Sequence, residues 1–400
     1  MTTQRVTIER LVAGGDALAH LDDGRVVFVD GALPGEVADV EITQSKKDFA
    51  RATLTHVVTP SPHRVSPPCP NVARGCGGCS WQHLDHDRHR DTKVDLVTEA
   101  LRRTARLEDV SVAFAGSLPP NHSRTTLRMA VAPDGRLGFR RSSSHEIVQI
   151  DDCLVAHPLL AELIRDARVE GASEVTMRCG VASGERGVWL HDDKGRDVKG
   201  AQVTGLPDDV KVGKRAVIHE TVHGVNLQVS MPAFFQTSAV AAELLVNAVN
   251  VAAGDEALSG DFGPIVDAYG GGGLFSATLV DTDVEIVLVE SNKSAINDAH
   301  VNLANHDVVI EQIAVEQWRP IEAGLVIADP ARNGLGKVGA EAIVATEARR
   351  IVLVSCDAVA GARDLRLLID AGYRLETVSV LDLFPHTPHV EMVSALSRAR

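Results

Sequence analysis

Residues 265–276 of the 400-residue chain read IVDAYGGGGLFS, and the fold of the C-terminal part follows from this stretch. An apolar strand containing Asp267 runs directly into four glycines, which let the backbone approach a ligand closely and open a helix N-terminus. The next apolar run, EIVLVE, ends in Glu290, where a carboxylate typically accepts hydrogen bonds from ribose hydroxyls. This unit indicates a nucleoside cofactor, either NAD or S-adenosylmethionine, although the glycines fit the dinucleotide spacing G-x-G-x-x-G poorly.

Outward from this stretch, helical segments and continuous apolar segments alternate from about residue 236 to the C-terminus. Such alternation is typical of an α/β fold, here a doubly wound, Rossmann-like domain over residues 236–400 with helices on both faces of a parallel sheet. Ligands bind such sheets beyond the C-terminal ends of the strands. Four residues at strand ends are therefore expected along one rim: Asp267, Glu290, Asp329 and Cys356.

Two further domains are expected before residue 236. Residues 1–60 alternate apolar and polar positions between Gly and Asp-Gly turns, which predicts a small OB-like β-barrel, a common platform for nucleic acids. After a proline-rich linker, residues 61–235 predict a central β-rich domain. The helix expected at residues 86–107 has one broad apolar face and is a candidate to pack back on the C-terminal domain.

The bulk composition limits the class of protein. The chain has no run of about 18 apolar residues and no N-terminal apolar run before a small-residue cleavage site, so we expect a cytoplasmic protein without membrane contact. The formal charge of −14 argues mildly against a nucleic-acid partner. Residues 121–146 nevertheless carry five arginines against two acidic residues, and form either a phosphate-contacting strip or a set of scattered, solvated arginines.

Cys356 stands where the strand RIVLVS ends, a position at which a cysteine more often belongs to the core than to an active site. Its neighbours favour chemistry, because Asp329 lies on the same predicted rim and Glu391 follows near the C-terminus. A thiolate and a carboxylate together suit methylation of uracil at C5. Addition of the thiolate to C6 makes C5 nucleophilic, and a base must then remove the C5 proton so that the thiolate can leave.

Over nearly its whole length, the chain resembles the RNA uracil-C5 methyltransferases that act on ribosomal and transfer RNA. The resemblance rests on six motifs in order: Phe234-Phe235-Gln236, Asp267 to Ser276, Glu290, Asp329-Pro330-Ala331-Arg332, Ser355-Cys356-Asp357 and His389-Val390-Glu391. It implies that Cys356 is the nucleophile and Glu391 the base. It also implies that four residues line the S-adenosylmethionine site: Gln236, Tyr269, Glu290 and Asp329.

The chain departs from the family pattern at three places. Asp357-Ala358 replaces the usual Asn-Pro after the cysteine, and Pro330-Ala331 replaces two prolines. Leu274 stands where an Asn normally ends the glycine loop, which removes a polar contact to the cofactor. A carboxylate at position 357 is expected to raise the pKa of the Cys356 thiol if the two side chains lie close together.

Four other cysteines indicate a metal site. Cys69, Cys76 and Cys79 have the spacing C-x6-C-x2-C, and Cys153 follows far downstream. This pattern suits a cubane iron–sulfur cluster better than a zinc ribbon with two C-x2-C pairs, and unligated thiols are the third possibility. The spacing also differs from the compact C-x3-C-x2-C of radical S-adenosylmethionine enzymes. By resemblance, the ribosomal members of the family carry a [4Fe–4S] cluster on this spacing, together with an N-terminal TRAM barrel.

The sequence therefore predicts an enzyme that methylates a uridine at C5, with 23S ribosomal RNA favoured as the partner and the chain acting as a monomer. Transfer RNA is the alternative substrate. A catalytically silent RNA-binding protein on the same fold and an NAD-dependent oxidoreductase are the competing hypotheses from other classes. The sixth cysteine, Cys179, matches no motif and is expected in the core.

Overall fold

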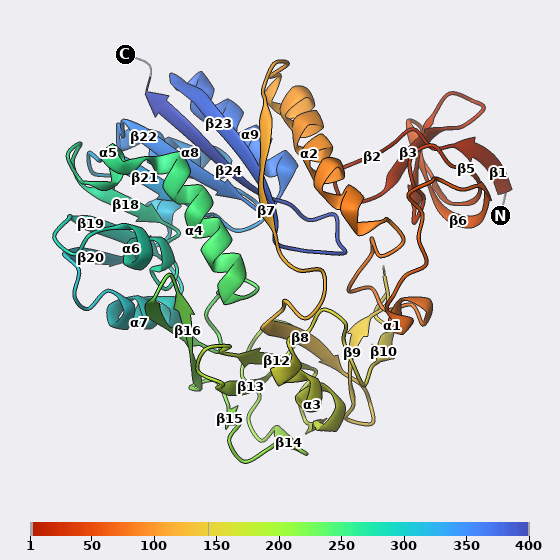
Figure 1. Ribbon diagram of the computed structural model, residues 1–400, viewed down its shortest axis with the longest axis horizontal. Helices are drawn as coiled ribbons and strands as arrows, with labels where there is room; N and C mark the ends of the chain where they lie inside the picture. Colours follow the sequence, from red (N-terminus) through yellow and green to blue (C-terminus); the bar gives the residue numbers. More distant parts are fainter. Residues whose placement is uncertain (1–2, 143, 399–400) are drawn as a thin grey trace.

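The computed structural model describes residues 3–142 and 144–398. Figure 1 shows an N-terminal β unit, a β-rich part in yellow and olive, and a larger helix–sheet–helix part in green and blue. Within the described residues no helix is both long enough and apolar enough to cross a membrane.

The N-terminal unit is a six-stranded sheet that curves into a half-barrel. In spatial order its strands are β1 (Thr3–Thr7), β5 (Val37–Ser45), β6 (Phe49–Thr59), β4 (Val26–Asp30), β3 (Ala17–His20) and β2 (Arg10–Leu11). Alternate apolar side chains such as Val27, Val29 and Val40 point to one fully buried side, as the period of a strand requires. The alternation in the sequence therefore predicted this unit correctly.

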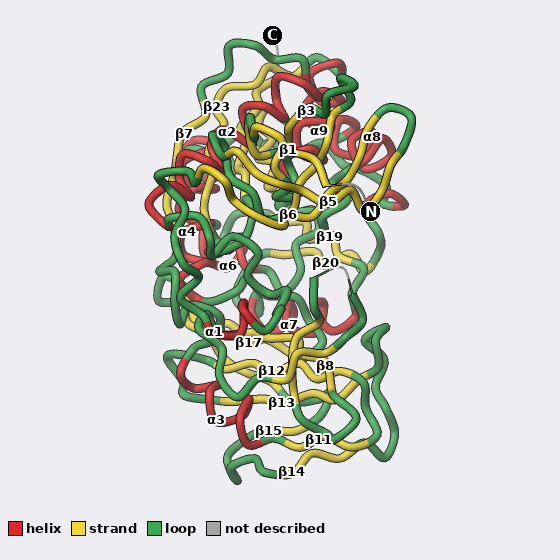
Figure 2. The backbone as a smooth tube through the Cα atoms, turned by 90° about the vertical axis from the view of Figure 1, so that its right-hand side faces the viewer, coloured by secondary structure: helices red, strands yellow, loops and turns green. Residues whose placement is uncertain are grey.

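The central part is built on a second six-stranded sheet with one covering helix. Its order is β10 (Ile147–Gln149), β9 (Leu137–Arg140), β8 (Thr126–Val131), β12 (Glu174–Cys179), β13 (Arg186–His191) and β15 (Lys211–Val212). Helix α3 (Pro158–Asp166) buries Leu160, Leu163 and Ile164 against this sheet. Two strand pairs flank it: β11 (Arg168–Glu170) with β14 (Gln202–Thr204), and β16 (Val217–Val222) with β17 (Val225–Ser230). Figure 2 shows this β-rich part below the rest of the molecule.

The C-terminal part is an eight-stranded mixed sheet. Its order is β20 (Val308–Gln312), β19 (Ile286–Glu290), β18 (Ile265–Ala268), β21 (Leu325–Ala328), β22 (Arg350–Ser355), β24 (Glu391–Arg398), β23 (Tyr373–Asp382) and β7 (Val112–Ser117). The first five strands are parallel, β24 runs antiparallel to both of its neighbours, and β7 is parallel to β23. The strands β18, β19, β21 and β22 and the helices among them were predicted from the sequence, whereas the strands β20, β23 and β24 were not.

Successive side chains of the sheet face opposite cores, so both faces must be covered by helices. One face packs against α4 (Ala239–Ala253), α6 (Leu274–Leu279) and α7 (Lys293–Asn302), and the short α5 (Asp255–Leu258) follows α4. The other face packs against α2 (His89–Ala100), α8 (Gly336–Ala345) and α9 (Ala358–Asp370). This doubly wound arrangement leaves the C-terminal ends of the parallel strands free at one edge.

The segment before residue 118 does not follow the expected division at residue 236. Residues 112–117 were assigned to the central domain, but β7 extends the C-terminal sheet. Helix α2 packs against the same sheet, as expected for the helix at residues 86–107. The helix expected at residues 86–107 is divided into a 3-10 turn (His86–Arg88), α2 and a π turn (Leu101–Ala105). Arg106, in the left-handed region with φ of 57°, then ends the helical segment. Local sequence cannot predict the placement of β7, because its partner strand β23 lies far along the chain.

Candidate active site

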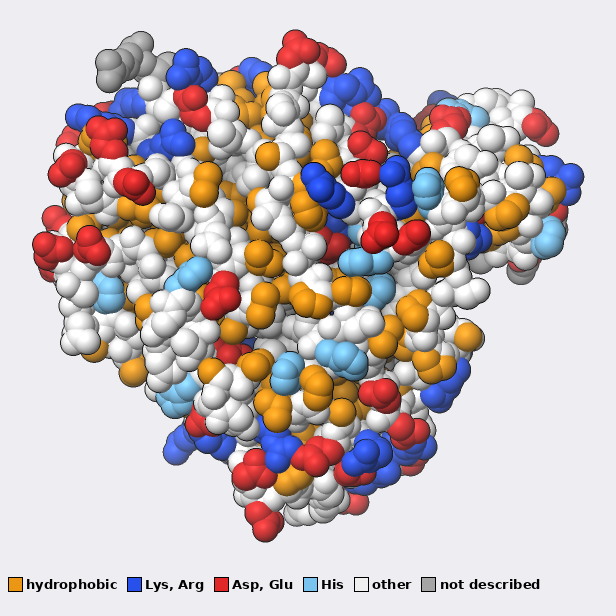
Figure 3. Space-filling view, in the orientation of Figure 1, with side chains coloured by type: hydrophobic (Ala, Val, Ile, Leu, Met, Phe, Trp, Pro, Cys, Tyr) orange, Lys and Arg blue, Asp and Glu red, His pale blue; other side chains and the backbone are white. Residues whose placement is uncertain are grey.

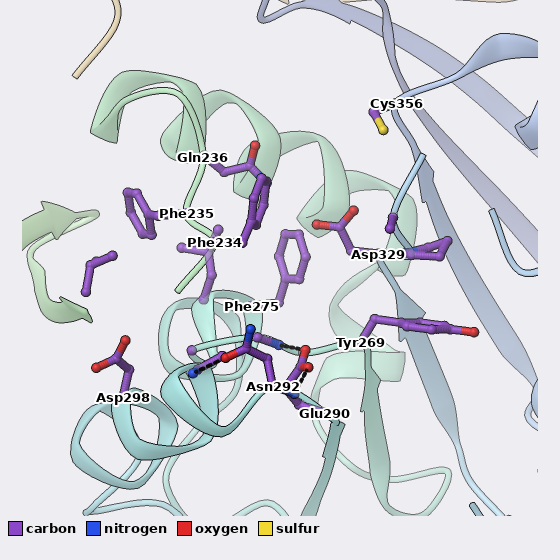
Figure 4. Close-up of a pocket in the computed structure, with 18 of the residues that line it drawn as sticks. Phe234, Phe235, Gln236, Tyr269, Phe275, Glu290, Asn292, Asp298, Asp329 and Cys356 are labelled. Atoms are coloured by element: carbon purple, nitrogen blue, oxygen red, sulfur yellow. Dashed lines mark hydrogen bonds between the residues drawn. The ribbon is translucent and has the colours of Figure 1, made fainter. Parts of the chain in front are cut away.

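A cavity of about 580 Å³ opens at the C-terminal ends of the parallel strands. Its walls come from the segment before α4, the glycine loop after β18, the ends of β19, β21 and β22, and the loop before β24. Six side chains predicted from the sequence line this one cavity: Gln236, Tyr269, Glu290, Asp329, Cys356 and Glu391. Figure 4 shows Glu290 at one end of the cavity and Cys356 at the other.

The glycine loop between β18 and α6 forms one wall of the cavity. Tyr269 lies in the left-handed region with φ of 59°, and Gly271 and Gly273 follow with φ of 55° and 82°. A Cβ at Gly270 would stand 2.8 Å from Leu288 Cγ and 2.9 Å from Asp267 Cγ, so only glycine fits there. The loop therefore brings backbone amides to the cavity and opens α6.

Glu290 is fixed at the end of β19 by two backbone amides. Its carboxylate accepts hydrogen bonds from Gly271 N at 3.1 Å and from Asn292 N at 2.5 Å (Figure 4). The carboxylate thus ties the glycine loop to the start of α7, and it lines the cavity where its remaining lone pairs can accept hydroxyl donors.

Asp267 does not lie on the rim as the sequence analysis expected. It is inside strand β18, is 1% exposed, and accepts a hydrogen bond of 2.6 Å from Ser276 Oγ. Burial raises the pKa of Asp267 to about 6. Asp267 is the last residue but one of β18, and its side chain is directed towards Ser276 of α6. Asp267 thus contacts the helix that follows the glycine loop and is not among the residues that line the cavity.

Cys356 and Glu391 are brought together by the register of two antiparallel strands. Ser355, the last residue of β22, is paired with Met392 of β24, so the next residue on β22 adjoins the one before Met392. Those residues are Cys356 and Glu391, and both line the cavity. Burial, followed by the charges of Glu391 and Asp329, raises the pKa of the Cys356 thiol to about 11.

Two buried carboxyl groups accompany the thiol. Burial, and then the charge of Asp267, raise the pKa of Asp329 to about 7. Burial, and then the charge of Asp329, raise the pKa of Glu391 well above its usual value. Each of these groups takes up a proton more readily than a free carboxylate does, since burial disfavours the charged form.

The segment before α4 lies across the cavity from the strand ends. Phe234 is 74% exposed, whereas Gln236 is buried and lines the cavity. Arg178 of β12 holds this segment by donating to the carbonyl oxygens of Ser230 and Ala233, both at 2.9 Å. The central part of the molecule therefore supplies a buried guanidinium that shapes the wall of the cavity.

Two supporting residues were not found from the sequence. Arg178 supports the segment before α4, and Asn302 of α7 donates to Gly272 O at 2.8 Å and so braces the glycine loop. Neither residue belongs to a motif, and each acts on backbone atoms of a segment remote in sequence. No local pattern indicates such contacts.

The four clustered cysteines line a second cavity, of about 50 Å³, in the central part. Cys69, Cys76, Cys79 and Cys153 are all free thiols, and Cys179 is buried elsewhere, on β12. Among the described residues no group of three or more His, Cys, Asp or Glu side chains is arranged to hold a single metal ion. The structure thus gathers the predicted ligands around one space and leaves the cluster itself unconfirmed.

The comparisons with known proteins agree with this architecture. The model of the TRAM domain matches residues 1–55. An uncharacterized RNA methyltransferase of Streptomyces avermitilis is 35% identical over 98% of this chain and 98% of its own length. The 23S rRNA (uracil(1939)-C(5))-methyltransferase of Pectobacterium atrosepticum is 32% identical, with 97% of this chain and 92% of the relative covered.

A solved structure matches the whole chain as well. The tRNA (uracil-54, C5)-methyltransferase of Pyrococcus abyssi, in complex with S-adenosyl-L-homocysteine, has a TM-score of 0.73 at 25% identity and covers 98% of this chain and 100% of its own. The fold and the cavity thus define an RNA methyltransferase with an N-terminal TRAM domain. More specifically, the chain belongs to the family of RNA uracil-C5 methyltransferases.

Proposed function

We propose that the protein methylates C5 of a uridine in ribosomal RNA, with Cys356 as the nucleophile and Glu391 as the general base. One observation carries the proposal: the strand register places a thiol beside a buried carboxyl group at one end of the cavity, and Glu290 lies at the other. A cavity that holds both a nucleoside-binding end and a thiol–carboxyl end suits a reaction between a bound methyl donor and a base.

S-adenosylmethionine, when bound, supplies an electrophilic methyl group to the cavity. The residues present fit this group, since Glu290 offers acceptors for ribose hydroxyls and the glycine loop allows close approach of the ligand. Gln236, Tyr269 and Asp329 complete the lining of this end. The relative of known structure contains S-adenosyl-L-homocysteine, which has the same nucleoside.

Cys356 acts first in the proposed reaction. Its thiol gives up its proton to solvent and the sulfur bonds to C6 of the uracil, which gives C5 enolate character. C5 then takes the methyl group, and the sulfonium sulfur of the donor keeps the electron pair of the broken bond. Glu391 removes the remaining proton from C5, the double bond re-forms, and the C6–sulfur bond breaks to release Cys356.

The surroundings of Glu391 suit the proton-removal step. A carboxylate whose pKa is raised is a stronger base, and burial together with Asp329 raises the pKa of Glu391. Addition by Cys356 is harder, because burial and the same carboxyl groups raise the pKa of the thiol. Arg332 opposes this effect by lowering the pKa of the thiol, and it lines the same cavity.

Ribosomal RNA is preferred over transfer RNA as the proposed substrate. The relative named for 23S rRNA is 32% identical to this chain, whereas the structural neighbour named for tRNA is 25% identical. The TRAM domain and the cysteine-lined cavity are the two features that the sequence analysis associated with ribosomal members of the family.

We also propose that Cys69, Cys76, Cys79 and Cys153 hold a [4Fe–4S] cluster. All four thiols face one cavity, and Leu127, Phe139 and Ile150 supply apolar walls around it. Zinc would need its sulfurs about 2.3 Å from a single ion, whereas the thiolates of a cubane stand further apart because each binds a different iron. The absence of a single-ion arrangement in the described residues is therefore compatible with a cubane. The proposed role of the cluster is structural.

An adduct experiment with 5-fluorouridine tests the proposed reaction. Fluorine at C5 cannot be removed as a proton, so the covalent intermediate should accumulate on Cys356 when the methyl donor is present. Purified protein is incubated with 5-fluorouridine-substituted rRNA or tRNA and analysed on a denaturing gel. We expect a shifted band with rRNA that is lost in Cys356→Ala and kept in the control Cys179→Ala. A band with tRNA alone would assign the alternative substrate, and no band with either RNA would contradict the mechanism.

A further inference from the structure

The loop between β23 and β24, residues 383–390, determines where the proposed base stands. Phe384 and His389 of this loop line the cavity, and Glu391 follows as the first residue of β24. The rings of Phe384 and His389 contact each other edge to face, with centroids 5.8 Å apart. A displacement of the loop would therefore move one wall of the cavity and the proposed base together.

A lysine from a remote segment is inserted at the start of this loop. Lys93 lies on α2, is 0% exposed, and donates to Asp382 Oδ1 at 2.5 Å and to Phe384 O at 3.1 Å. Asp382 ends β23 and also accepts from Phe384 N at 3.2 Å. The ammonium thus bridges the last residue of the strand and the second residue of the loop.

The conformation of the loop depends on these contacts. Phe384 O also accepts a hydrogen bond from Thr387 Oγ1 at 2.8 Å, so Lys93 binds the carbonyl around which the turn folds. His386 lies in the left-handed region with φ of 62°, and its carbonyl accepts from Trp81 N at 2.9 Å. A non-glycine residue keeps such a conformation only where its surroundings impose it.

Arg124 and three histidines are the other titratable groups around Lys93 and Asp382. His89 Nδ1 of α2 lies 3.9 Å from Asp382 Oδ2, and the rings of His86 and His386 lie 5.1 Å and 6.1 Å from that of His89. Burial lowers the pKa of His89 to about 4, so this ring is neutral near pH 7. Figure 3 shows histidine side chains gathered at the centre of one face, where the parts of the molecule meet. Lys93 is the cation that bonds to the backbone of the loop, whereas Arg332 approaches the ring of His389 at 3.5 Å.

Stability alone is a poor explanation for this ion pair. Removing two charges from water costs about as much as their attraction returns, and apolar replacements of buried pairs are often as stable or more so. A buried ion pair is better explained by the single geometry that it imposes on the segments it joins. Here the pair joins α2, which comes before the central part of the chain, to the loop that leads into the proposed base.

We propose that Lys93 is a positioning residue: by holding residues 383–390 it places Glu391 for removal of the C5 proton. This inference rests on the proposed function. In this inference Lys93 affects the last chemical step without contacting the RNA or the methyl donor. Addition by Cys356 and methyl transfer precede that step, so they should be affected much less.

The test uses a charge-neutral pair of substitutions. Lys93→Met alone leaves Asp382 buried and unpaired and is at risk of not folding, so the main variant is Lys93→Met with Asp382→Asn. It keeps an acceptor for Phe384 N and removes the ammonium from Phe384 O. Lys337→Met, on the exposed surface of α8 with 81% of its side chain accessible, is the matched control. All variants are assayed in the full chain with the RNA that the wild type methylates.

We expect kcat of the double variant to fall by about 100-fold, the lower end of what a positioned general base contributes. KM for S-adenosylmethionine should change by less than about threefold, since the other end of the cavity is unaltered. Ordinary uridine RNA should then give an adduct that already carries the methyl group and remains linked to Cys356, because release needs the base. Lys337→Met should behave as the wild type.

Two results would overturn the inference while leaving the proposed function intact. In the first, the double variant turns over at the wild-type rate. The second is a sign of a general loss of structure: kcat falls without any methylated adduct, or both substrates bind more weakly. Failure of the wild type to form an adduct with 5-fluorouridine RNA would instead contradict the proposed function itself.

Discussion

Cys356 and Asp357 are adjacent in sequence, but their side chains lie in different surroundings. The sequence analysis expected the Asp357 carboxylate to raise the pKa of the thiol if the two side chains lay close together. The structure turns that carboxylate away to the start of α9, where it accepts from Val359 N at 3.0 Å and Ala360 N at 2.9 Å. The carboxyl groups that do raise the pKa of Cys356 belong to Glu391 and Asp329. Asp357 is thus a helix cap, and Asn, which the family usually has there, caps equally well.

Substitution at position 357 should therefore change stability more than chemistry. Asp357→Ala should lower the free energy of unfolding by about 1 kcal/mol, the usual cost of losing an N-cap. Asp357→Asn should preserve it, and the rate of adduct formation with 5-fluorouridine RNA should stay within about twofold of the wild type. Urea denaturation and a time course of the gel shift measure both. A large acceleration in Asp357→Asn would show that the carboxylate does act on the thiol.

Asp329 should make the protein less stable as the pH rises. Its pKa is about 7 in the folded protein, above the ordinary aspartate value of 3.8, so between these values the folded state binds more protons than the unfolded state. The stabilising contribution of the Asp329 carboxyl group is then fully present below about pH 4 and is lost as the pH rises towards 7. We expect unfolding of the wild type to become easier from pH 5 to pH 8 by on the order of 2 kcal/mol more than that of Asp329→Asn. Equal slopes would contradict the raised pKa.

Among the elements, the glycine loop is the one in which the choice of residue is most restricted. Gly270 packs against Leu288 and Asp267, and no side-chain atom fits between them. By contrast, a Cβ at Gly272 would meet Asp298 Cβ at 3.5 Å, an ordinary contact. Neighbouring glycines of one loop therefore differ sharply in what they tolerate.

Gly270→Ala should displace the loop and weaken binding of S-adenosyl-L-homocysteine by about tenfold or more, equal to about 1.4 kcal/mol. Gly272→Ala should weaken it much less. Isothermal titration calorimetry with the two variants gives both dissociation constants. An equal loss in both would mean that the loop's backbone is not what positions the ligand.

Some elements were predictable because their sequence alone specifies them. Strands β18, β19, β21 and β22 are continuous apolar runs, as strands buried on both faces must be. Strand β7 was assigned to the wrong sheet and β24 was not expected at all. Their identity depends on pairing across long separations, and β24 supplies the register on which the Cys356–Glu391 contact depends.

At the scale of the whole molecule, the arginine-rich stretch is not a free phosphate-binding strip. Arg128 and Arg140 both pair with Glu174, Arg136 pairs with Asp151, and Arg141 with Glu146. Arg124 differs, because it lines the cysteine cavity. The sequence could not show that these arginines pair with acidic side chains, because Glu174 comes from β12 and is remote in sequence from Arg128 and Arg140. The positive charge of the stretch is therefore offset locally by acidic partners.

The proposed cluster joins a segment before α2 to the central sheet, so its loss should be measurable in the full chain. Anaerobically purified protein should be brown and contain about four iron and four sulfide per chain. Cys76→Ser should bleach it and lower the iron content, whereas Cys179→Ala should keep the colour. Stoichiometric zinc in a colourless preparation would contradict the proposal.

For the site as a whole, the sequence predicted the reacting groups, but it did not predict the residues that support them. Motifs named six of the residues that line the cavity. Arg178, Asn302 and Lys93 act on the backbone of remote segments, and only the folded chain brings them there. Asp267, which belongs to a motif, turned out to contact the helix that follows the loop from inside its strand.

The assignment of Cys356 and Glu391 is tested most directly by Glu391→Gln with ordinary uridine RNA and S-adenosylmethionine. Without the base, the methylated uridine should remain bonded to sulfur. Nuclease and protease digestion followed by mass spectrometry should then find a peptide in which Cys356 carries a methylated uridine nucleotide. An adduct on another residue, or normal release of 5-methyluridine by Glu391→Gln, would contradict the proposed mechanism.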